Sequence, residues 1–198
     1  MLDLASLYPM SMMTLNASPE TKSPDGELVA PNGVRFKKSP DGLTRMILKE
    51  LIESRLEKKR LRDRYPLGSD EYRKYDLQQA AIKVITNSYY GVSGYPRFRL
   101  YDRDIAAATT SVGRAIIRHT KSVIESMGYE VVYGDTDSCM VTVGGGKDLD
   151  EVIEIGKEIE RRVNESYDDF AKTLNADKHY FSIKFEKVYS RFFQAGTK

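Results

Sequence analysis

The chain of 198 residues has no tryptophan, one cysteine and no marked excess of either charge. Its only cysteine, Cys139, excludes an internal disulfide and fits a reducing compartment. No apolar run approaches the ~20 residues that cross a bilayer, and no signal peptide follows Met1, so we expect no membrane partner. The net charge of +2 is too small to indicate a class of partner.

The residues that are present are typical of a soluble globular protein, with 40% hydrophobic and 30% charged. A chain of this length can bury a sizeable core as one domain with a protruding subdomain. Residues 43–64 hold eight Lys and Arg against four Asp and Glu, whereas residues 148–169 hold nine acids against three bases. We expect one face of the protein to bind polyanions and another to face water, although a charged helix face is also commonly just solvated.

A candidate metal site lies in the stretch 133–138, which reads YGDTDS. Strand-forming runs at 129–133 and 139–143 flank it and predict a hairpin with these acids in its turn. In extended backbone Asp135 and Asp137 point to the same side, where their charges repel unless a cation neutralises them. Mg²⁺ suits two carboxylates together with substrate phosphates. Gly and Asp are also the commonest turn residues, so a plain polar turn is the alternative.

The first five residues predict a short strand, so the chain begins almost inside an element, and we expect an excised fragment or one part of a split gene. Residues 16–42 predict a long connection with a short strand at 34–36. Helices are predicted at about 104–127 and 148–174, and strands at 181–186 and 188–194. The expected buried stripes of the two helices are Ile105, Ala108, Val112, Ile116, Val123 and Met127, and Leu149, Val152, Ile155, Ile159, Val163 and Phe170.

Two further helices are predicted at 43–64 and about 69–90, the second with a Ser or Asp cap at its start. The connection between them is short, which places them antiparallel. On the second helix Lys83, Asn87 and Tyr90 fall on one face, which suits an anion. A solvated basic face is the alternative that this spacing leaves open.

With this helical pair set aside, the predicted order is strand, helix, strand, strand, helix, strand. That order indicates an α+β fold of the ferredoxin-like, split β-α-β-β-α-β kind, an antiparallel sheet with two helices on one face. We expect the first strand and the strand at 129–133 to be central neighbours, which brings Asp3 toward Asp135 and Asp137. Three acids placed in this way suit two-metal phosphoryl transfer, with cationic helices adding electrostatic stabilisation.

Three segments stand out in order: DLASLYP at 3–9, KVITNSYYG at 83–91 and YGDTDS at 133–138. Together they resemble the polymerase motifs of family B DNA polymerases, of the archaeal and eukaryotic replicative kind. The resemblance implies the palm and fingers of a longer enzyme, which transfers a dNTP to a primer 3′-OH on primer–template DNA. It assigns residues 1–42 and 93–198 to the palm and residues 43–92 to the fingers, an inserted antiparallel two-helix hairpin.

The resemblance also implies roles for the matching positions. Asp3 and Asp137 are expected to bind two Mg²⁺ ions, for which Mn²⁺ can substitute, and the Leu4 carbonyl completes one site. Asp135 supports them, and Glu186 is a further acid nearby, with an exposed strand residue as its alternative. Tyr8 is expected to pack under the deoxyribose and leave no room for a 2′-OH. The other assignments are the triphosphate for Ser6, Leu7, Arg55, Lys59, Lys83 and Asn87, the nascent base pair for Tyr90 and Gly91, and primer–template DNA for Lys198.

The chain departs from the family pattern at Met10, where Ser is usual, and it holds neither the exonuclease domain nor the thumb. Those regions are expected in cis or on another chain, because processive binding needs many phosphate contacts. A nuclease, a non-catalytic nucleic-acid-binding subunit and half of a split polymerase are the alternatives. The expected location is the cytoplasm of a prokaryote-like cell, at the nucleoid.

Overall fold

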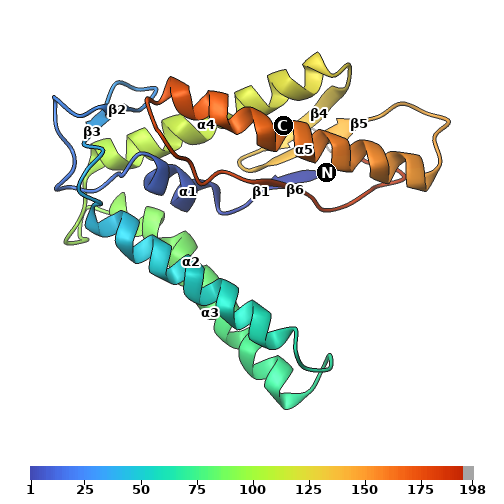
Figure 1. The fold of residues 1–198 in the computed structure, drawn as a ribbon, viewed down its shortest axis with the longest axis horizontal. Helices are drawn as coiled ribbons and strands as arrows, with labels where there is room; N and C mark the ends of the chain where they lie inside the picture. Colours follow the sequence, from blue (N-terminus) through green and yellow to red (C-terminus); the bar gives the residue numbers. More distant parts are fainter. Residues whose placement is uncertain (194–198) are drawn as a thin grey trace.

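The structure, a computed structural model, describes residues 1–193. Its elements are β1 (Leu2–Leu4), α1 (Leu7–Thr14), β2 (Leu28–Val29), β3 (Arg35–Phe36), α2 (Leu43–Arg62), α3 (Asp70–Ser93), α4 (Arg103–Ser126), β4 (Glu130–Asp135), β5 (Ser138–Thr142), α5 (Leu149–Thr173) and β6 (Ile183–Phe185). Four strands form an antiparallel sheet in the order β4-β5-β1-β6, and β2 pairs with β3 separately. Figure 1 shows α4 and α5 lying over the sheet, while α2 and α3 project together from one end of the molecule.

The two faces of the sheet differ because successive side chains of a strand alternate. Leu2 and Cys139, which face each other in the register of β1 and β5, are almost fully buried in the core that α4 and α5 complete. Asp3 lies between Ser138 of β5 and Lys184 of β6 in the same register. The sheet therefore presents a polar face on the side opposite to its core.

Helices α4 and α5 form because each combines an apolar stripe at helical spacing with a side-chain cap. Asp102 accepts the N–H groups of Asp104 and Ile105 at the start of α4, and Asp148 forms a capping box with Glu151 at the start of α5. Both helices confirm the sequence prediction to within one residue at each end. No helix within residues 1–193 is long and apolar enough to cross a membrane.

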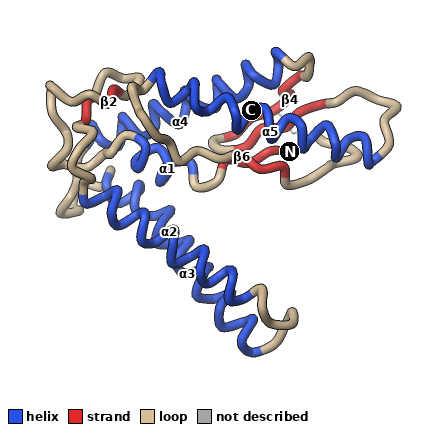
Figure 2. The backbone as a smooth tube through the Cα atoms, viewed as in Figure 1, coloured by secondary structure: helices blue, strands red, loops and turns tan. Residues whose placement is uncertain are grey.

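The helical hairpin of α2 and α3 is anchored at its base. Arg45, near the start of α2, donates from Nε to the Met13 carbonyl at 2.8 Å and from Nη2 to the Thr14 carbonyl at 3.3 Å. Figure 2 shows this base beside α1, whereas the loop at the far end of the hairpin lies away from the rest of the chain. The antiparallel pair was predicted, and Ser69 caps α3 by accepting the N–H of Tyr72. The hairpin is thus held mainly through its base.

The sheet corrects one prediction, because β1 lies beside β5 and β6 and not beside β4. An edge strand leaves one row of its backbone N–H and C=O groups unpaired, and this position is taken by β4, a strand without a fully buried residue. The central position goes to β5, which carries the buried Cys139. Leu149, expected to be buried, is 61% exposed at the start of α5. Residues 188–193 are not a strand, and Gln194 lies outside the described part of the chain.

Candidate active site

Strand β1 and the turn between β4 and β5 bring Asp3 and Asp137 together. The backbone N–H of Leu4 donates to the Asp137 carbonyl at 2.7 Å, which joins the first strand to the turn. Thr136, in the turn, has a φ of 45°, a left-handed conformation that few residues other than glycine adopt. Its hydroxyl donates to the Asp135 carboxylate at 3.0 Å. The acidic turn is therefore shaped by its own hydrogen bonds and fixed to the strand that carries Asp3.

Asp3 and Asp137 are half-buried carboxylates that disfavour each other's charge. The pKa of Asp3 is raised, first by burial and then by the negative charges of Asp137 and Glu186. The pKa of Asp137 is also raised, mainly by burial; a hydrogen bond from its own backbone N–H opposes the rise, and the charges of Asp135 and Glu186 add to it. Lys83 of α3 opposes both shifts, so its positive charge reaches the two acids across from the hairpin.

The chemistry of this donor set suits a divalent cation shared with a substrate. Within residues 1–193, no three Asp, Glu, His or Cys side chains are grouped closely enough to hold a metal by themselves. Asp135 and Glu186 are exposed, which leaves Asp3 and Asp137 as the half-buried pair. Two carboxylates completed by phosphate oxygens and water are the ligands that Mg²⁺ usually takes. The pair therefore fits Mg²⁺ together with a phosphate-bearing ligand.

The cationic face predicted for the hairpin divides into two groups. Lys83 acts on the acids, whereas Arg55 and Lys59 lie along α2, where the charge of Arg55 acts on Lys59. Burial lowers the pKa of Lys59, and the positive charges of Arg55 and of Lys184 in β6 lower it further. Arg55 also donates from Nε to Gln79 of α3 at 3.3 Å. Lys184 is a cation of this region that the sequence did not reveal, although its alternation with Glu186 in the predicted strand 181–186 was a signal.

Tyr8 of α1 and Tyr90 of α3 are in contact, with ring centroids 4.3 Å apart and ring planes tilted by 33°. Tyr8 lies in the first turn of α1, after Ser6, whose φ of 49° and ψ of 52° are left-handed. Among the described residues, the Ser6 side chain caps no N–H of this helix. The N–H groups at the start of α1, beginning with Leu7, are thus free of a side-chain cap, and such a helix start favours an anion.

Three other predicted residues add less to this geometry. Asn87 and Gly91 are exposed on α3, and Asn87 lies one helical turn after Lys83 on the same face. Lys198, expected to contact primer–template DNA, lies outside the described residues. Met10, which replaces the Ser usual in the family, packs against the core while partly buried.

A pocket of about 340 Å³ beside Tyr8 contains residues that the sequence did not single out. Its walls include Thr136 of the acidic turn and five residues of α4, among them Gly113, Arg114 and Arg118. The two arginines are four residues apart and so share a helix face, which was the only sequence signal for them. The positive charge of Arg114 also acts on the hydroxyl of Tyr90. The pocket therefore places two further cations, Arg114 and Arg118, beside Tyr8.

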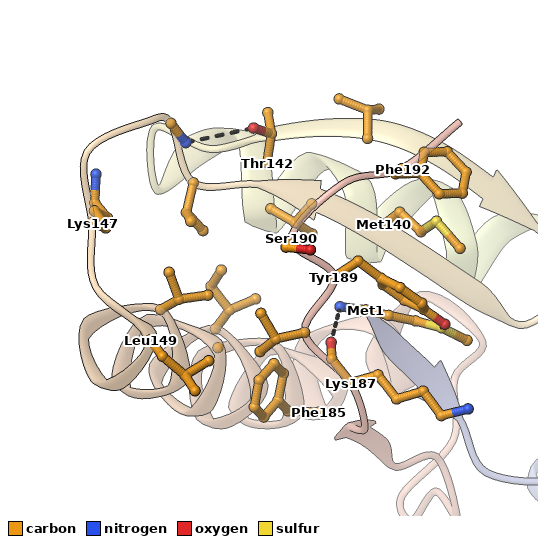
Figure 3. Close-up of a pocket in the computed structure, with 18 of the residues that line it drawn as sticks. Met1, Met140, Thr142, Lys147, Leu149, Phe185, Lys187, Tyr189, Ser190 and Phe192 are labelled. Carbon is orange, nitrogen blue, oxygen red and sulfur yellow. Dashed lines mark hydrogen bonds between the residues drawn. The ribbon is translucent and has the colours of Figure 1, made fainter. Parts of the chain in front are cut away.

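A larger cavity of about 910 Å³ lies elsewhere, beside the segment 187–192. Figure 3 shows Met140, Leu149, Phe185 and Phe192 around it. Its walls are mainly apolar side chains, and none of the site residues predicted from the sequence lines it. We therefore place the candidate site at the acids of β1 and the turn, not at the larger cavity.

Known proteins match almost the whole chain. The sequence model described as DNA polymerase family B matches residues 1–194. The chain belongs to DNA polymerase family B. The DNA polymerase of Archaeoglobus fulgidus is 40% identical over 187 residues, which are 93% of this chain and 23% of that family member. The DNA polymerase alpha catalytic subunit of Xenopus laevis is 33% identical over 175 residues, 84% of this chain and 12% of that protein.

A solved family B polymerase has a similar fold. The structure of the family B DNA polymerase from Pyrobaculum calidifontis matches with a TM-score of 0.68 at 34% identity, covering 94% of this chain and 23% of that chain. The chain thus spans about a quarter of the length of its archaeal family B relatives. The family predicted from the three sequence motifs is confirmed, as is a mixed fold of helices and one four-stranded antiparallel sheet.

Proposed function

We propose that this chain supplies the palm and fingers of a DNA polymerase, which transfers a nucleotide from a dNTP to a primer 3′-OH. Residues 1–42 and 93–198 would form a ferredoxin-like palm of the split β-α-β-β-α-β type, and residues 43–92 would form the fingers. One observation carries the proposal. Asp3 and Asp137 lie close together, because a main-chain hydrogen bond joins their segments, and the charge of Lys83 on the hairpin acts on both of them.

Asp3 and Asp137 would hold two Mg²⁺ ions, or Mn²⁺ in their place, with the Leu4 carbonyl as a further oxygen. When bound, the ions would activate the attacking oxygen and stabilise the leaving one. Asp135 and Glu186 would support the pair by keeping the surrounding charge negative. The raised pKa values of the two carboxyl groups support this assignment. Burial and nearby negative charge disfavour their ionised forms, which a bound cation would stabilise.

Side chains of the hairpin would bind the triphosphate. Lys83 and Asn87 share one face of α3, so they would contact phosphate oxygens close to the acids. Arg55 and Lys59 lie on the other helix and would reach the phosphates when the hairpin closes over the palm. Such contacts would strengthen toward the transition state, where negative charge on the leaving phosphates increases.

The start of α1 and the end of α3 would orient the rest of the nucleotide. The backbone N–H groups of Ser6 and Leu7 would donate to the triphosphate at a helix start without a side-chain cap. Tyr8 would lie under the deoxyribose and exclude a 2′-OH by its volume. Tyr90 and Gly91 would line the nascent base pair, which agrees with the contact between the Tyr90 and Tyr8 rings.

Primer–template DNA and a dNTP are the proposed substrates, at the nucleoid in the cytoplasm of a prokaryote-like cell. The grip on duplex DNA would come from the exonuclease and thumb regions, in cis or on another chain. The share of the Archaeoglobus fulgidus polymerase that this chain spans, 23%, supports such partners. Half of a split polymerase is therefore one specific form of the proposed function.

A chimera tests the proposal, with residues 1–194 replacing the matching segment of the Archaeoglobus fulgidus DNA polymerase. Primer extension is compared between the chimera and the same protein carrying Asp137→Asn. We expect the variant to extend primers at least about 10³-fold more slowly, equivalent to ~4 kcal/mol of lost stabilisation. Equal extension by both proteins would contradict the catalytic assignment. A chimera that binds primer–template normally but extends no primer would favour a non-catalytic DNA-binding role.

A further inference from the structure

The ring of Tyr8 rests against a glycine in the middle of α4. A Cβ atom built on Gly113 would lie 3.2 Å from Cε1 and 3.7 Å from Cδ1 of Tyr8. The shorter distance is tighter than nine in ten real Cβ contacts, so a methyl group there would displace the ring by a few tenths of an ångström. Tyr90 of α3 contacts the same ring, which therefore has neighbours on two helices.

Backbone conformation does not explain this glycine. Gly113 lies inside α4, and it is not one of the glycines with a positive φ. Glycine is the least favourable helix residue after proline, so alanine would favour the helix at this position. A Cβ here would also lie 3.5 Å from Cδ2 of Leu7, an ordinary contact, so the close approach of Tyr8 is the feature of the structure that disfavours a side chain at this position.

We propose that Gly113 is a positioning residue, which sets the distance between the Tyr8 ring and α4 and thereby the fit of the nucleotide sugar. The inference rests on the proposed role of Tyr8 under the deoxyribose. Tyr8 is partly exposed, and the pocket beside it gives its ring room to move. A methyl group on residue 113 would push the ring off α4 toward its open side and narrow the space for the sugar.

Nucleotide binding to the full chain tests this inference. Isothermal titration calorimetry with dATP and Mg²⁺ compares the wild type, Gly113→Ala, Tyr8→Ala and the double variant, after thermal melting has checked that each folds. We expect Gly113→Ala to weaken dATP binding about three- to tenfold, because the displaced ring crowds the sugar. Tyr8→Ala should cancel that effect in the double variant, whereas Tyr8→Phe, which keeps the ring, should not.

A second measurement reports the ring without nucleotide. Fluorine NMR of the chain labelled with 3-fluorotyrosine resolves the signals of Tyr8 and Tyr90, assigned with Tyr8→Phe and Tyr90→Phe. We expect Gly113→Ala to move both signals. The control Gly145→Ala should move neither, because a Cβ on Gly145 meets no atom within 4 Å.

Unmoved ring signals in Gly113→Ala would overturn the inference. Moved signals with unchanged dATP affinity would also overturn it, as would a weakening that persists when Tyr8 is alanine. Failure of the wild-type chain to bind dATP is a separate result, seen before any variant is compared. It would overturn the proposed nucleotide site, and the role of Gly113 in sugar fit with it.

Discussion

The backbone N–H of Leu4 donates to the Asp137 carbonyl, so the strand that carries Asp3 and the turn that carries Asp137 are joined through the main chain. This hydrogen bond does not depend on the charge of either side chain. The two carboxylates are therefore held close while they repel each other. Enforced repulsion of this kind should be measurable in the stability of the chain.

The first prediction concerns pH in the absence of divalent metal. The pKa values of Asp3 and Asp137 are raised above the ordinary 3.8, so the folded chain binds more protons than the unfolded chain from pH 3.8 up to the raised values. The free energy of unfolding contributed by these groups therefore falls as the pH rises through that interval. We expect Asp137→Asn to melt at a higher temperature than the wild type at pH 7, with the gap closing below pH 3.8.

Thermal melting in EDTA across this pH range checks the first prediction. Glu50→Gln, which alters an exposed acid of α2, is the control and should leave the melting temperature unchanged. A wild type that is more stable than Asp137→Asn at pH 7 would contradict the raised pKa values.

Mg²⁺ should stabilise the folded chain, because a cation between Asp3 and Asp137 removes their repulsion. For a dissociation constant of about 1 mM, 10 mM Mg²⁺ stabilises by ~1.4 kcal/mol, which raises the melting temperature of a chain of this size by about 3–5 °C. Differential scanning calorimetry should show this rise in the wild type and in Glu50→Gln. A rise of the same size in Asp137→Ala would show that the cation binds elsewhere.

Removal of the Tyr8 ring should relax the choice of sugar. In the chimera with the Archaeoglobus fulgidus polymerase, Tyr8→Ala should raise ribonucleotide incorporation by about 10- to 200-fold and leave deoxynucleotide use largely intact, since only a steric clash is lost. Steady-state incorporation of ATP and dATP opposite the same template base measures the ratio. Tyr95→Ala, which removes an exposed ring, is the control. An unchanged ratio in Tyr8→Ala would exclude this role.

Lys83 should act on the nucleotide and not on the duplex. Lys83→Ala in the chimera should lower kcat/KM for the nucleotide by about 10²–10³, because ~3–4 kcal/mol of charge-assisted stabilisation is lost. Primer–template affinity should barely change. Lys49→Ala removes an exposed lysine from the same hairpin and should alter neither quantity.

Single-turnover incorporation and a DNA-binding titration on each protein make this comparison. A merely solvated basic face predicts the reverse result for Lys83→Ala, normal incorporation with a small, salt-sensitive loss of DNA binding.

The base of the hairpin should depend on one buried arginine. The Arg45 side chain is 4% exposed, and its hydrogen bonds satisfy the carbonyls of Met13 and Thr14. Arg45→Met would take the arginine donors from both carbonyls, leaving the Met13 carbonyl with the Asn16 N–H at 3.2 Å, and should cost about 3 kcal/mol, or roughly 6–12 °C in melting temperature. Thermal melting checks this, with Lys49→Met as the exposed control. Equal melting temperatures for the two variants would show that the base of the hairpin has other support.

The long helices were predictable because α4 and α5 combine a periodic apolar stripe with side-chain caps. The short helix α1 was not, because its residues are buried on several sides, including the polar Ser11 and Thr14, and no amphipathic period remains. Strand order was predicted wrongly for β4, since local patterns specify which residues extend but not which strand they pair with. In the structure β1 pairs with β5, where Leu2 and Cys139 lie opposite each other and are both buried, a long-range contact that no local pattern contains.

The candidate site was likewise predictable from the sequence only in part. The approach of Asp3 to the acidic turn was predicted through a pairing of the first strand with β4, whereas the structure brings it about through β5 and the Leu4–Asp137 hydrogen bond. The three motifs predicted the family. The sequence did not reveal Lys184, Arg114 or Gly113, because their importance arises from what packs opposite them. Gly113 is the clearest case, since a glycine inside a helix acquires meaning only when Tyr8 is seen against it.

The length of the hairpin amplifies any rotation at its base. Helix α2 is 20 residues long, so it extends about 30 Å from its base, and a rotation of about 10° at Arg45 would move its far end by about 5 Å. At ~1.5 Å per residue, Lys59 lies about 21 Å along α2 from Arg45, and Lys83 lies about 15 Å along α3 from Ser93 at its end. The same small rotation would therefore move Lys59 farther than Lys83, whose charge already acts on both acids.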